Sequence, residues 1–224
     1  MKSKALTIGF LFVLLGLRSV AQNNDVVIKG INDKLATQSK TISNVLSDPS
    51  LMSLHSLTAF REVIKKNAKA EKISLITDRE PGVKITVKGM VLDKAGIPQA
   101  NLLVYVYQTS SEGWYSDTAP HILQNEGDHR HARLFGYFKT GADGKFEFET
   151  VKPKGYPNSS LPAHIHIEIE EKDRSFYISE LLFDDDPRLV GQIRARAIEE
   201  HFIIVKNTGS KDQPLYSYKV QFAN

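Results

Sequence analysis

The chain has 224 residues, of which 41% are hydrophobic and 25% are charged, and its formal net charge is +3. This composition is typical of a folded globular domain and excludes a disordered or membrane-embedded chain, and the small charge argues against a nucleic-acid partner. The absence of cysteine excludes disulfides, thiolate metal sites and cysteine nucleophiles, so a metal would have to be held by His, Tyr, Asp or Glu.

Residues 1–21 have the layout of a secretory signal peptide. Lys2 and Lys4 precede an apolar run from Ala5 to Leu17, and small residues at 19 and 21 match the two positions that a signal peptidase reads. The run is shorter than the ~20 residues that cross a bilayer. We therefore expect cleavage near Ala21 and a secreted or periplasmic protein without a stable membrane span, with a retained anchor as the alternative.

A helical segment is expected over residues 22–72. Apolar residues recur at helix-like spacing from Ile31 to Asp48, and neither Pro nor Gly interrupts them. Asp48-Pro49 predicts a break, and a second amphipathic helix is expected from about Leu51 to Ala70. These helices are expected to pack against the main domain or against a second copy of the chain.

From residue 73 to residue 224 the apolar period changes to two, which is typical of β-strands. Asp143-Gly144 supplies the positive φ values of a tight turn and predicts a hairpin, and Lys206 to Gln213 is expected to be a hairpin loop. Many short strands without intervening helices predict a mainly β fold, a β-sandwich. The expected strands are Val83 to Val91, Leu102 to Tyr107, Tyr137 to Thr140, Phe146 to Thr150, Ala163 to Glu170, Phe176 to Phe183, His201 to Val205 and Tyr216 to Phe222.

His164 and His166 are two positions apart on a predicted strand, so their imidazoles point to the same face. Two neighbouring neutral imidazoles can form half of a metal site. The spacing alone leaves an ordinary solvated strand face as the alternative interpretation.

Further motifs surround this histidine pair. They are Gly89 to Asp93 with Gly96 and Pro98, Val106-Tyr107-Gln108 leading to Gly113-Trp114-Tyr115, Thr140 to Gly144, Val151 to Pro157, and Pro162-Ala163-His164-Ile165-His166. In these segments, from about Val87 to Pro187, the chain resembles the intradiol ring-cleavage dioxygenases, a family that includes protocatechuate 3,4-dioxygenase and catechol 1,2-dioxygenase. The resemblance implies the intradiol type of β-sandwich with an N-terminal helical segment.

The resemblance also implies a single non-haem ferric ion, Fe(III), bound by Tyr115, Tyr156, His164 and His166. A free phenol has a pKa of about 10, but a bound trivalent cation favours its phenolate form. Two anionic oxygens would then stabilise ferric over ferrous iron. Ordinary packing at the ends of strands remains the alternative for the two tyrosines.

The implied reaction is cleavage of a catechol-like aromatic ring with O2 to a muconate-type diacid. The catechol would bind as its dianion, and Tyr115 would have the catalytic role of leaving the metal and accepting a proton. Related catechol-cleaving enzymes dimerise through N-terminal helices, so a homodimer is a further expectation.

Two positions depart from the family pattern. Leu161 stands where the family has an arginine that stabilises negative charge on the ring, and Glu180 stands where it has a glutamine of the oxygen pocket. Leucine cannot donate a hydrogen bond, and a carboxylate repels a dianionic substrate. In the polar stretch that includes His129-Arg130-His131, Arg130 or Arg133 could supply the missing positive charge, with a solvated loop as the alternative.

Asp184-Asp185-Asp186 is an acidic run that ends at Pro187. It lacks the alternating ligands and the glycine of a calcium loop, so a turn at a strand end is expected. Two rivals to the iron enzyme stay open. One is a non-catalytic transthyretin-like sandwich that binds a ligand or partner, and the other is a zinc or copper enzyme that uses the two histidines.

Overall fold

The computed structural model describes residues 23–116, 132–171 and 174–221, and for residues 171 and 174–178 it describes the backbone alone. The predicted signal peptide and the His129-Arg130-His131 segment lie outside the described residues. None of the helices in the described ranges is long and apolar enough to cross a membrane.

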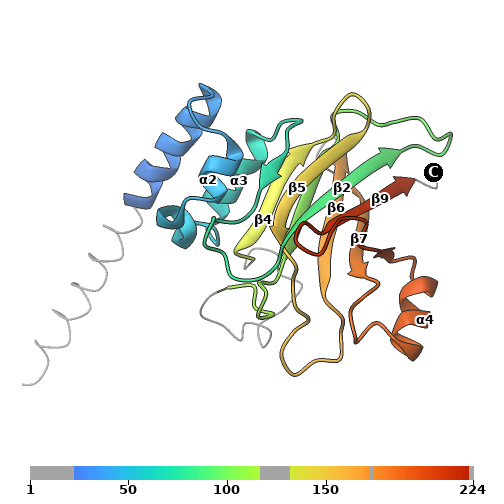
Figure 1. The fold of residues 1–224 in the computed structure, drawn as a ribbon. Coiled ribbons are helices and arrows are strands. Elements are labelled where there is room, and N and C mark those ends of the chain that lie inside the picture. Colours follow the sequence, from blue (N-terminus) through green and yellow to red (C-terminus); the bar gives the residue numbers. More distant parts are fainter. Residues whose placement is uncertain (1–22, 117–131, 172–173, 222–224) are drawn as a thin grey trace, which may run out of the picture.

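Two β-sheets face each other as a sandwich (Figure 1), so the prediction of a mainly β fold is confirmed. One sheet has four strands in the order β1-β5-β2-β9, and the other has five in the order β4-β3-β6-β7-β8. The strands are β1 (Ile73–Ser74), β2 (Lys84–Leu92), β3 (Leu103–Gln108), β4 (Leu134–Lys139), β5 (Lys145–Val151), β6 (His164–Glu171), β7 (Arg174–Phe183), β8 (Ile203–Val205) and β9 (Leu215–Gln221).

Strand β6 shows how the apolar period positions the polar residues. Ile165, Ile167 and Ile169 are each 0% exposed and belong to the core between the sheets. Because side chains alternate along a strand, His164 and His166 point to the outer face of the five-stranded sheet. Burial of the isoleucines therefore fixes the direction of the histidines.

The predicted hairpin between β4 and β5 is wrong. β4 pairs with β3, whereas β5 pairs with β1 and β2, so the chain crosses from one sheet to the other at Asp143-Gly144. The turn itself forms, with Gly144 at φ +72. Aromatic packing across the core explains the crossing, because the centroid of the Phe138 ring lies 5.3 Å from that of Phe146 and 5.7 Å from that of Phe148.

The loop of residues 206–213 also joins strands of different sheets, but it closes as a hairpin loop, because Asn207 and Tyr216 form an antiparallel bridge and the Thr208 N–H donates to the Leu215 carbonyl at 2.8 Å.

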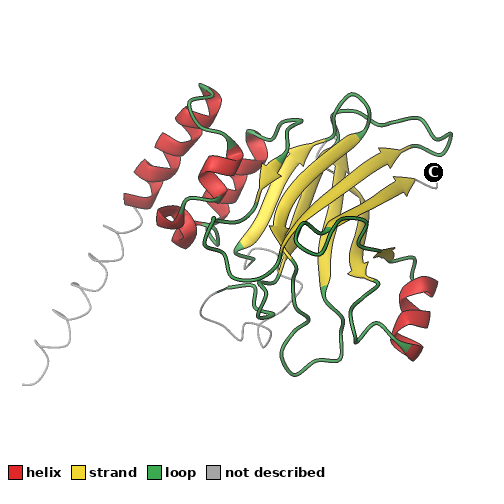
Figure 2. Ribbon diagram, in the orientation of Figure 1, coloured by secondary structure: helices red, strands yellow, loops and turns green. Residues whose placement is uncertain are grey.

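The N-terminal segment is helical, but its helices are shorter than predicted. A helix covers residues 23–36, and it is followed by α2 (Ile42–Leu46), the 3-10 helix η1 (Pro49–Leu54) and α3 (Thr58–Lys66). Gln38 adopts φ +57, and the Thr41 side chain caps α2 by accepting from the Asn44 N–H. These local conformations end and restart the helices where the apolar pattern continues. Figure 2 shows the N-terminal helices together on one side of the sandwich.

Helix α4 (Gly191–Glu199) lies between β7 and β8 and was not predicted. Its buried residue is Ala197, which packs with Leu182 and Leu189, while Ile198 is 58% exposed. The helix therefore lacks the wide apolar stripe by which an amphipathic helix is recognised in a sequence.

Candidate metal centre

Four predicted site residues meet at the outer face of the five-stranded sheet, beside the start of β6. His164 and His166 lie on β6, Tyr115 lies in the loop after β3, and Tyr156 lies in the loop between β5 and β6. Three of the side chains belong to buried residues, with exposed fractions of 3% for Tyr115, 7% for Tyr156 and 5% for His164. The site is thus built from one strand and two loops.

The two tyrosine loops are joined by backbone contacts. The Lys154 N–H donates to the Ser110 carbonyl at 3.1 Å, and the Thr109 hydroxyl donates to the Lys154 carbonyl at 2.8 Å. Gly113 has φ +92, and a Cβ there would lie 2.7 Å from the Gly155 carbonyl oxygen. A glycine is therefore required for this close approach, which places the two phenols side by side.

The polar ends of the four side chains are in contact. The Tyr115 and Tyr156 hydroxyl oxygens are 2.6 Å apart. The Tyr115 oxygen lies 2.8 Å from His166 Nε2, and the Tyr156 oxygen lies 3.0 Å from His164 Nε2. Two phenol oxygens and two imidazole nitrogens therefore point toward one another, as the predicted ligand set requires. That they bind a metal remains a prediction.

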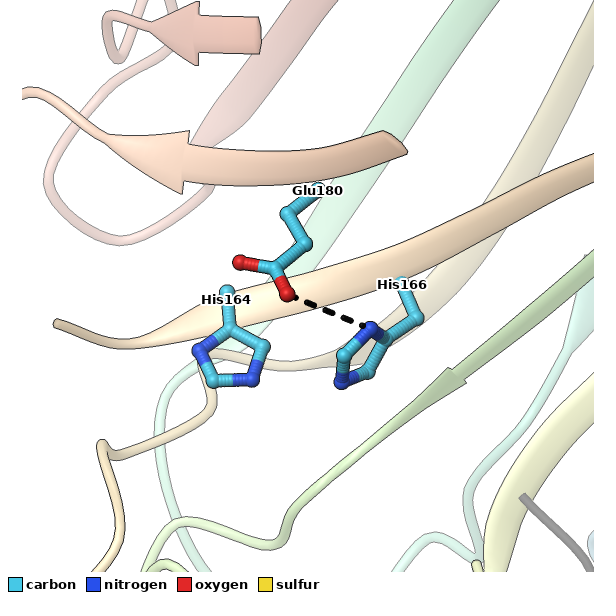
Figure 3. A group of neighbouring side chains, drawn as sticks. All are labelled: His164, His166 and Glu180. Carbon is cyan, nitrogen blue, oxygen red and sulfur yellow. Dashed lines mark ion pairs between the residues drawn. The ribbon is translucent and has the colours of Figure 1, made fainter. Parts of the chain in front are cut away.

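Both histidines can present Nε2 as the ligand atom. His164 Nδ1 lies 2.9 Å from the Pro162 carbonyl oxygen, and since a carbonyl can only accept, Nδ1 carries the proton. His166 Nδ1 faces the Glu180 carboxylate at 3.6 Å, as Figure 3 shows. A carbonyl or carboxylate behind the ring is the usual partner of a metal-binding histidine, because it fixes the tautomer and the ring orientation.

Glu180 offers a second potential ligand set, because His164, His166 and Glu180 each have a possible ligand atom within 4.8 Å of the others. The carboxylate is paired with Nδ1 of His166, however, whereas Nε2 faces Tyr115. The two nitrogens of one imidazole point in different directions and cannot bind the same ion. The two-tyrosine, two-histidine set is therefore favoured, with Glu180 as the partner of His166.

Burial raises the pKa of the Tyr115 phenol far above its ordinary value of 10.0. The adjacent Tyr156 phenol, Tyr107 and Glu180 raise this pKa further. The phenol therefore keeps its proton at neutral pH unless a cation is bound, and a trivalent cation would favour the phenolate. Phenolate oxygens and imidazole nitrogens are hard and borderline ligands that fit ferric iron.

Comparison with known proteins gives the family. Residues 59–223 match a family model described as Dioxygenase. The chain belongs to the intradiol dioxygenase family. Hydroxyquinol 1,2-dioxygenase of Rhizobium sp. (strain MTP-10005) is 29% identical over 122 residues, which cover 47% of this chain and 39% of that relative. Protocatechuate 3,4-dioxygenase beta chain of Burkholderia cepacia is 32% identical over 123 residues, which cover 51% of each chain.

The chain thus spans about half or less of the length of these curated relatives. Among solved structures, it is similar to the dioxygenase domain of a dioxygenase carbohydrate-binding protein fusion from Streptomyces sp. SirexAA-E, with a TM-score of 0.53 and 24% identity. That match covers 69% of this chain and 88% of the other. It supports the intradiol type of fold.

The two departures from the intradiol pattern lie beside the site. Glu180 is opposite His166 in the register of β7 and β6, which places it next to a predicted ligand. The Leu161 side chain is 49% exposed, and its carbonyl accepts from Arg188 Nη1 at 3.1 Å. At position 161 the contact to Arg188 is therefore made by the backbone carbonyl and not by the side chain.

Arg133 does not have a free charge to replace the missing arginine. Its guanidinium donates to both carboxylate oxygens of Glu80, at 2.6 and 2.7 Å, and the Glu80 side chain is 4% exposed. The Arg133 backbone N–H donates to the Tyr115 carbonyl at 2.6 Å. Arg133 thus holds the Tyr115 loop, and Arg130 lies outside the described residues.

Tyr107 is a site residue that was not predicted to act there. Its ring stacks on His166, with centroids 4.3 Å apart and an interplanar angle of 11°. β3 and β6 place Tyr107 directly opposite His166. The alternation along β3 indicates the face on which Tyr107 lies, but the register between strands distant in sequence is needed to identify its partner.

Proposed function

We propose that this protein is a non-haem Fe(III) intradiol dioxygenase that cleaves a catecholic ring with O2 to a muconate-type diacid. The observation that supports this proposal best is the convergence of the Tyr115 and Tyr156 oxygens with Nε2 of His164 and His166. Bound ferric iron would supply Lewis-acid activation of the catechol toward O2.

In this proposal all four side chains would bind the metal, and Tyr115 would also accept a proton from the substrate. Tyr156 and His164 form one contacting pair and Tyr115 and His166 form the other, so each phenol adjoins one imidazole. Tyr115 is the proposed proton acceptor, as the family resemblance implies. Its burial opposes the charged phenolate, so a Tyr115 phenolate released from a cation would take a proton readily from the catechol hydroxyl.

The pocket departures affect the binding of the catechol more than the binding of the metal. Glu180 adds negative charge next to His166, and Leu161 supplies no side-chain donor. Both weaken the attraction for a catechol dianion. We therefore propose weaker binding of the catechol, and so a lower kcat/KM, than an arginine and a glutamine at these positions would give.

The test begins with iron. Protein loaded with ferric iron should be burgundy, because phenolate-to-iron charge transfer absorbs visible light, and Tyr156→Phe should shift or bleach that colour. Elemental analysis separates iron from zinc or copper. An iron-loaded protein that stays colourless would exclude the tyrosine ligands.

Activity is then measured as oxygen uptake with catechol, hydroxyquinol and protocatechuate. Uptake that depends on iron and yields a muconate-type product supports the dioxygenase. A coloured protein that consumes no oxygen with any of the three would indicate the binding function of the rival hypothesis.

We also propose export after cleavage near Ala21 and a homodimer formed through the N-terminal helices. The first helix exposes Val26 by 68% and Val27 by 37%, which gives such a dimer an apolar surface to bury. The N-terminal sequence of the mature protein tests the cleavage, and sedimentation equilibrium tests the dimer.

A further inference from the structure

The three aspartates of the acidic run that follows β7 bind different partners. Asp184 accepts from Arg194 at 2.6 Å, and Asp185 accepts from Lys152 at 2.6 Å. Asp186 instead accepts from backbone N–H groups of the site. The predicted strand-end turn is confirmed, and Asp186 is the aspartate of the run that bonds to the backbone directly before the predicted ligand His164.

Asp186 holds the start of β6. Its Oδ2 accepts from the Ala163 N–H at 2.9 Å, immediately before His164. Its Oδ1 accepts from the Arg188 N–H at 2.7 Å. One carboxylate therefore joins the ligand strand to the turn after β7. Such charge-assisted bonds are shorter and stronger than those between neutral groups.

Arg188 holds the loop on the other side of Ala163. Its Nη1 donates to the Leu161 carbonyl at 3.1 Å and to the Tyr156 carbonyl at 3.3 Å. At Gly155 a Cβ would lie 2.4 Å from this Nη1 and 2.3 Å from the Leu161 oxygen. The guanidinium therefore packs where a glycine leaves room for it.

Together these contacts enclose the segment between two predicted ligands. Arg188 holds the backbone at Tyr156 and Leu161, Asp186 holds Ala163, and between them the Pro162 carbonyl fixes the ring of His164. A loop without such contacts would sample other conformations, and the spacing of Tyr156 and His164 would vary.

We propose that Asp186 and Arg188 are positioning residues that hold Tyr156 and His164 in the geometry for metal binding. This inference rests on the metal-binding part of the proposed function. It also explains how Leu161 is accommodated, because the contact to Arg188 uses the carbonyl that every residue has. Partners that orient metal ligands in this way typically contribute roughly 10–100-fold to metal affinity.

The decisive comparison is Arg188→Ala with Arg194→Ala. Both arginines follow the acidic run, but within the described residues Arg194 pairs with Asp184 and not with the loop that carries Tyr156. Iron affinity is measured by competition with a chelator, together with the charge-transfer spectrum and the free energy of unfolding of the metal-free protein. Arg188→Ala should weaken iron binding roughly 10–100-fold and shift the band, whereas Arg194→Ala should change neither.

Two further variants separate positioning from general stability. Arg188→Lys keeps a donor for the two carbonyls and should restore part of the iron affinity. Asp186→Asn must direct an amide N–H toward one of two backbone N–H groups, so it should weaken iron binding while Asp184→Asn does not. Equal losses in all arginine and aspartate variants would show a structural role and overturn the inference.

A metal-free measurement keeps this test independent of the proposed enzyme. In nitrogen-15-labelled protein without iron, the imidazole shifts of His164 should report the proton on Nδ1. Arg188→Ala should populate the other tautomer, and Arg194→Ala should not. An unchanged His164 tautomer together with unchanged iron affinity would refute the positioning role. A changed tautomer in a protein that binds no iron would support the orientation of His164 by Arg188 and would refute the iron enzyme.

Discussion

The two faces of β6 differ in what their side chains contribute. On the inner face, Ile165, Ile167 and Ile169 are 0% exposed and pack between the sheets. On the outer face, His164 and His166 contact the two tyrosines of the candidate metal centre. Because side chains alternate along the strand, the inner face contributes to stability and the outer face to the candidate metal centre. A substitution on the inner face should therefore lower the unfolding free energy and leave metal binding largely intact, and a substitution on the outer face should do the reverse.

The outer face is nevertheless a packed surface. The rings of Tyr105 and Tyr137 stack with centroids 4.4 Å apart, and Tyr105 and Tyr107 stack at 5.2 Å. Arg61 of α3 is 4% exposed, lies 3.7 Å from the Phe135 ring centroid and donates to the Ala132 carbonyl at 3.0 Å. The N-terminal helices thus cover a polar and aromatic layer that continues to the site.

The largest effect on the outer face is expected from His164→Ala. Loss of one of four ligands, buried and oriented by a carbonyl, should abolish iron binding and the charge-transfer colour. The measurement is iron content and visible absorption after loading and desalting. Unchanged colour would show that His164 is not a ligand. It would also contradict the assignment of metal binding to the outer face and of core packing to the inner face.

On the inner face, Ile167→Ala should act on stability instead. Removing buried methyl and methylene groups costs about 2–5 kcal/mol of unfolding free energy, because a cavity remains. Urea denaturation of the metal-free protein measures this loss. At low temperature, where the variant is folded, its iron site should keep the wild-type colour. A bleached site in folded Ile167→Ala would mean that the two faces are coupled.

The same alternation explains how much the sequence could predict. Period two along β6 is a local property, so the shared face of His164 and His166 could be predicted without knowing any partner strand. Tyr115 and Tyr156 have no such local signal and were identified by family motifs. The structure brings all four together through contacts between loops that lie far apart in the chain.

What could not be predicted depends on distant partners. Phe138 and Phe146 flank a turn typical of a hairpin, yet they pack across the core from opposite sheets. Asp186 and Arg188 bind backbone groups, which every residue has, so their sequence carries no sign of the partner. Register and tertiary packing decide these features.

The aromatic layer gives a smaller effect, which depends on pH. Burial raises the pKa of the Tyr137 phenol to about 12. Because the folded-state pKa lies above the unfolded value of about 10, the stabilising effect is complete below that value and is lost as pH rises toward the folded pKa. Unfolding free energy should therefore fall between about pH 10 and pH 12, by no more than about 1.4 kcal/mol per pH unit for this group.

Tyr137→Phe removes this titration and should make the decrease with pH shallower. Urea midpoints at several alkaline pH values measure it, and Ile167→Ala is the matched control because isoleucine does not titrate. If Tyr137→Phe and wild type lose stability in parallel, the phenol is not buried in the way that the stacking on Tyr105 indicates.

The smallest effect is expected from Glu180→Gln, which places the glutamine of the family pattern opposite His166. The variant removes a negative charge beside the site but keeps an oxygen that can accept from His166 Nδ1. For a catechol dianion, less repulsion should be worth on the order of 1 kcal/mol, or roughly a fivefold lower KM at low salt. Iron affinity should change little, since Glu180 is not a ligand in the favoured set and the glutamine oxygen can still orient the His166 ring. Loss of iron from Glu180→Gln would instead favour the set of His164, His166 and Glu180, and the outer face would then hold a different metal centre from the one proposed.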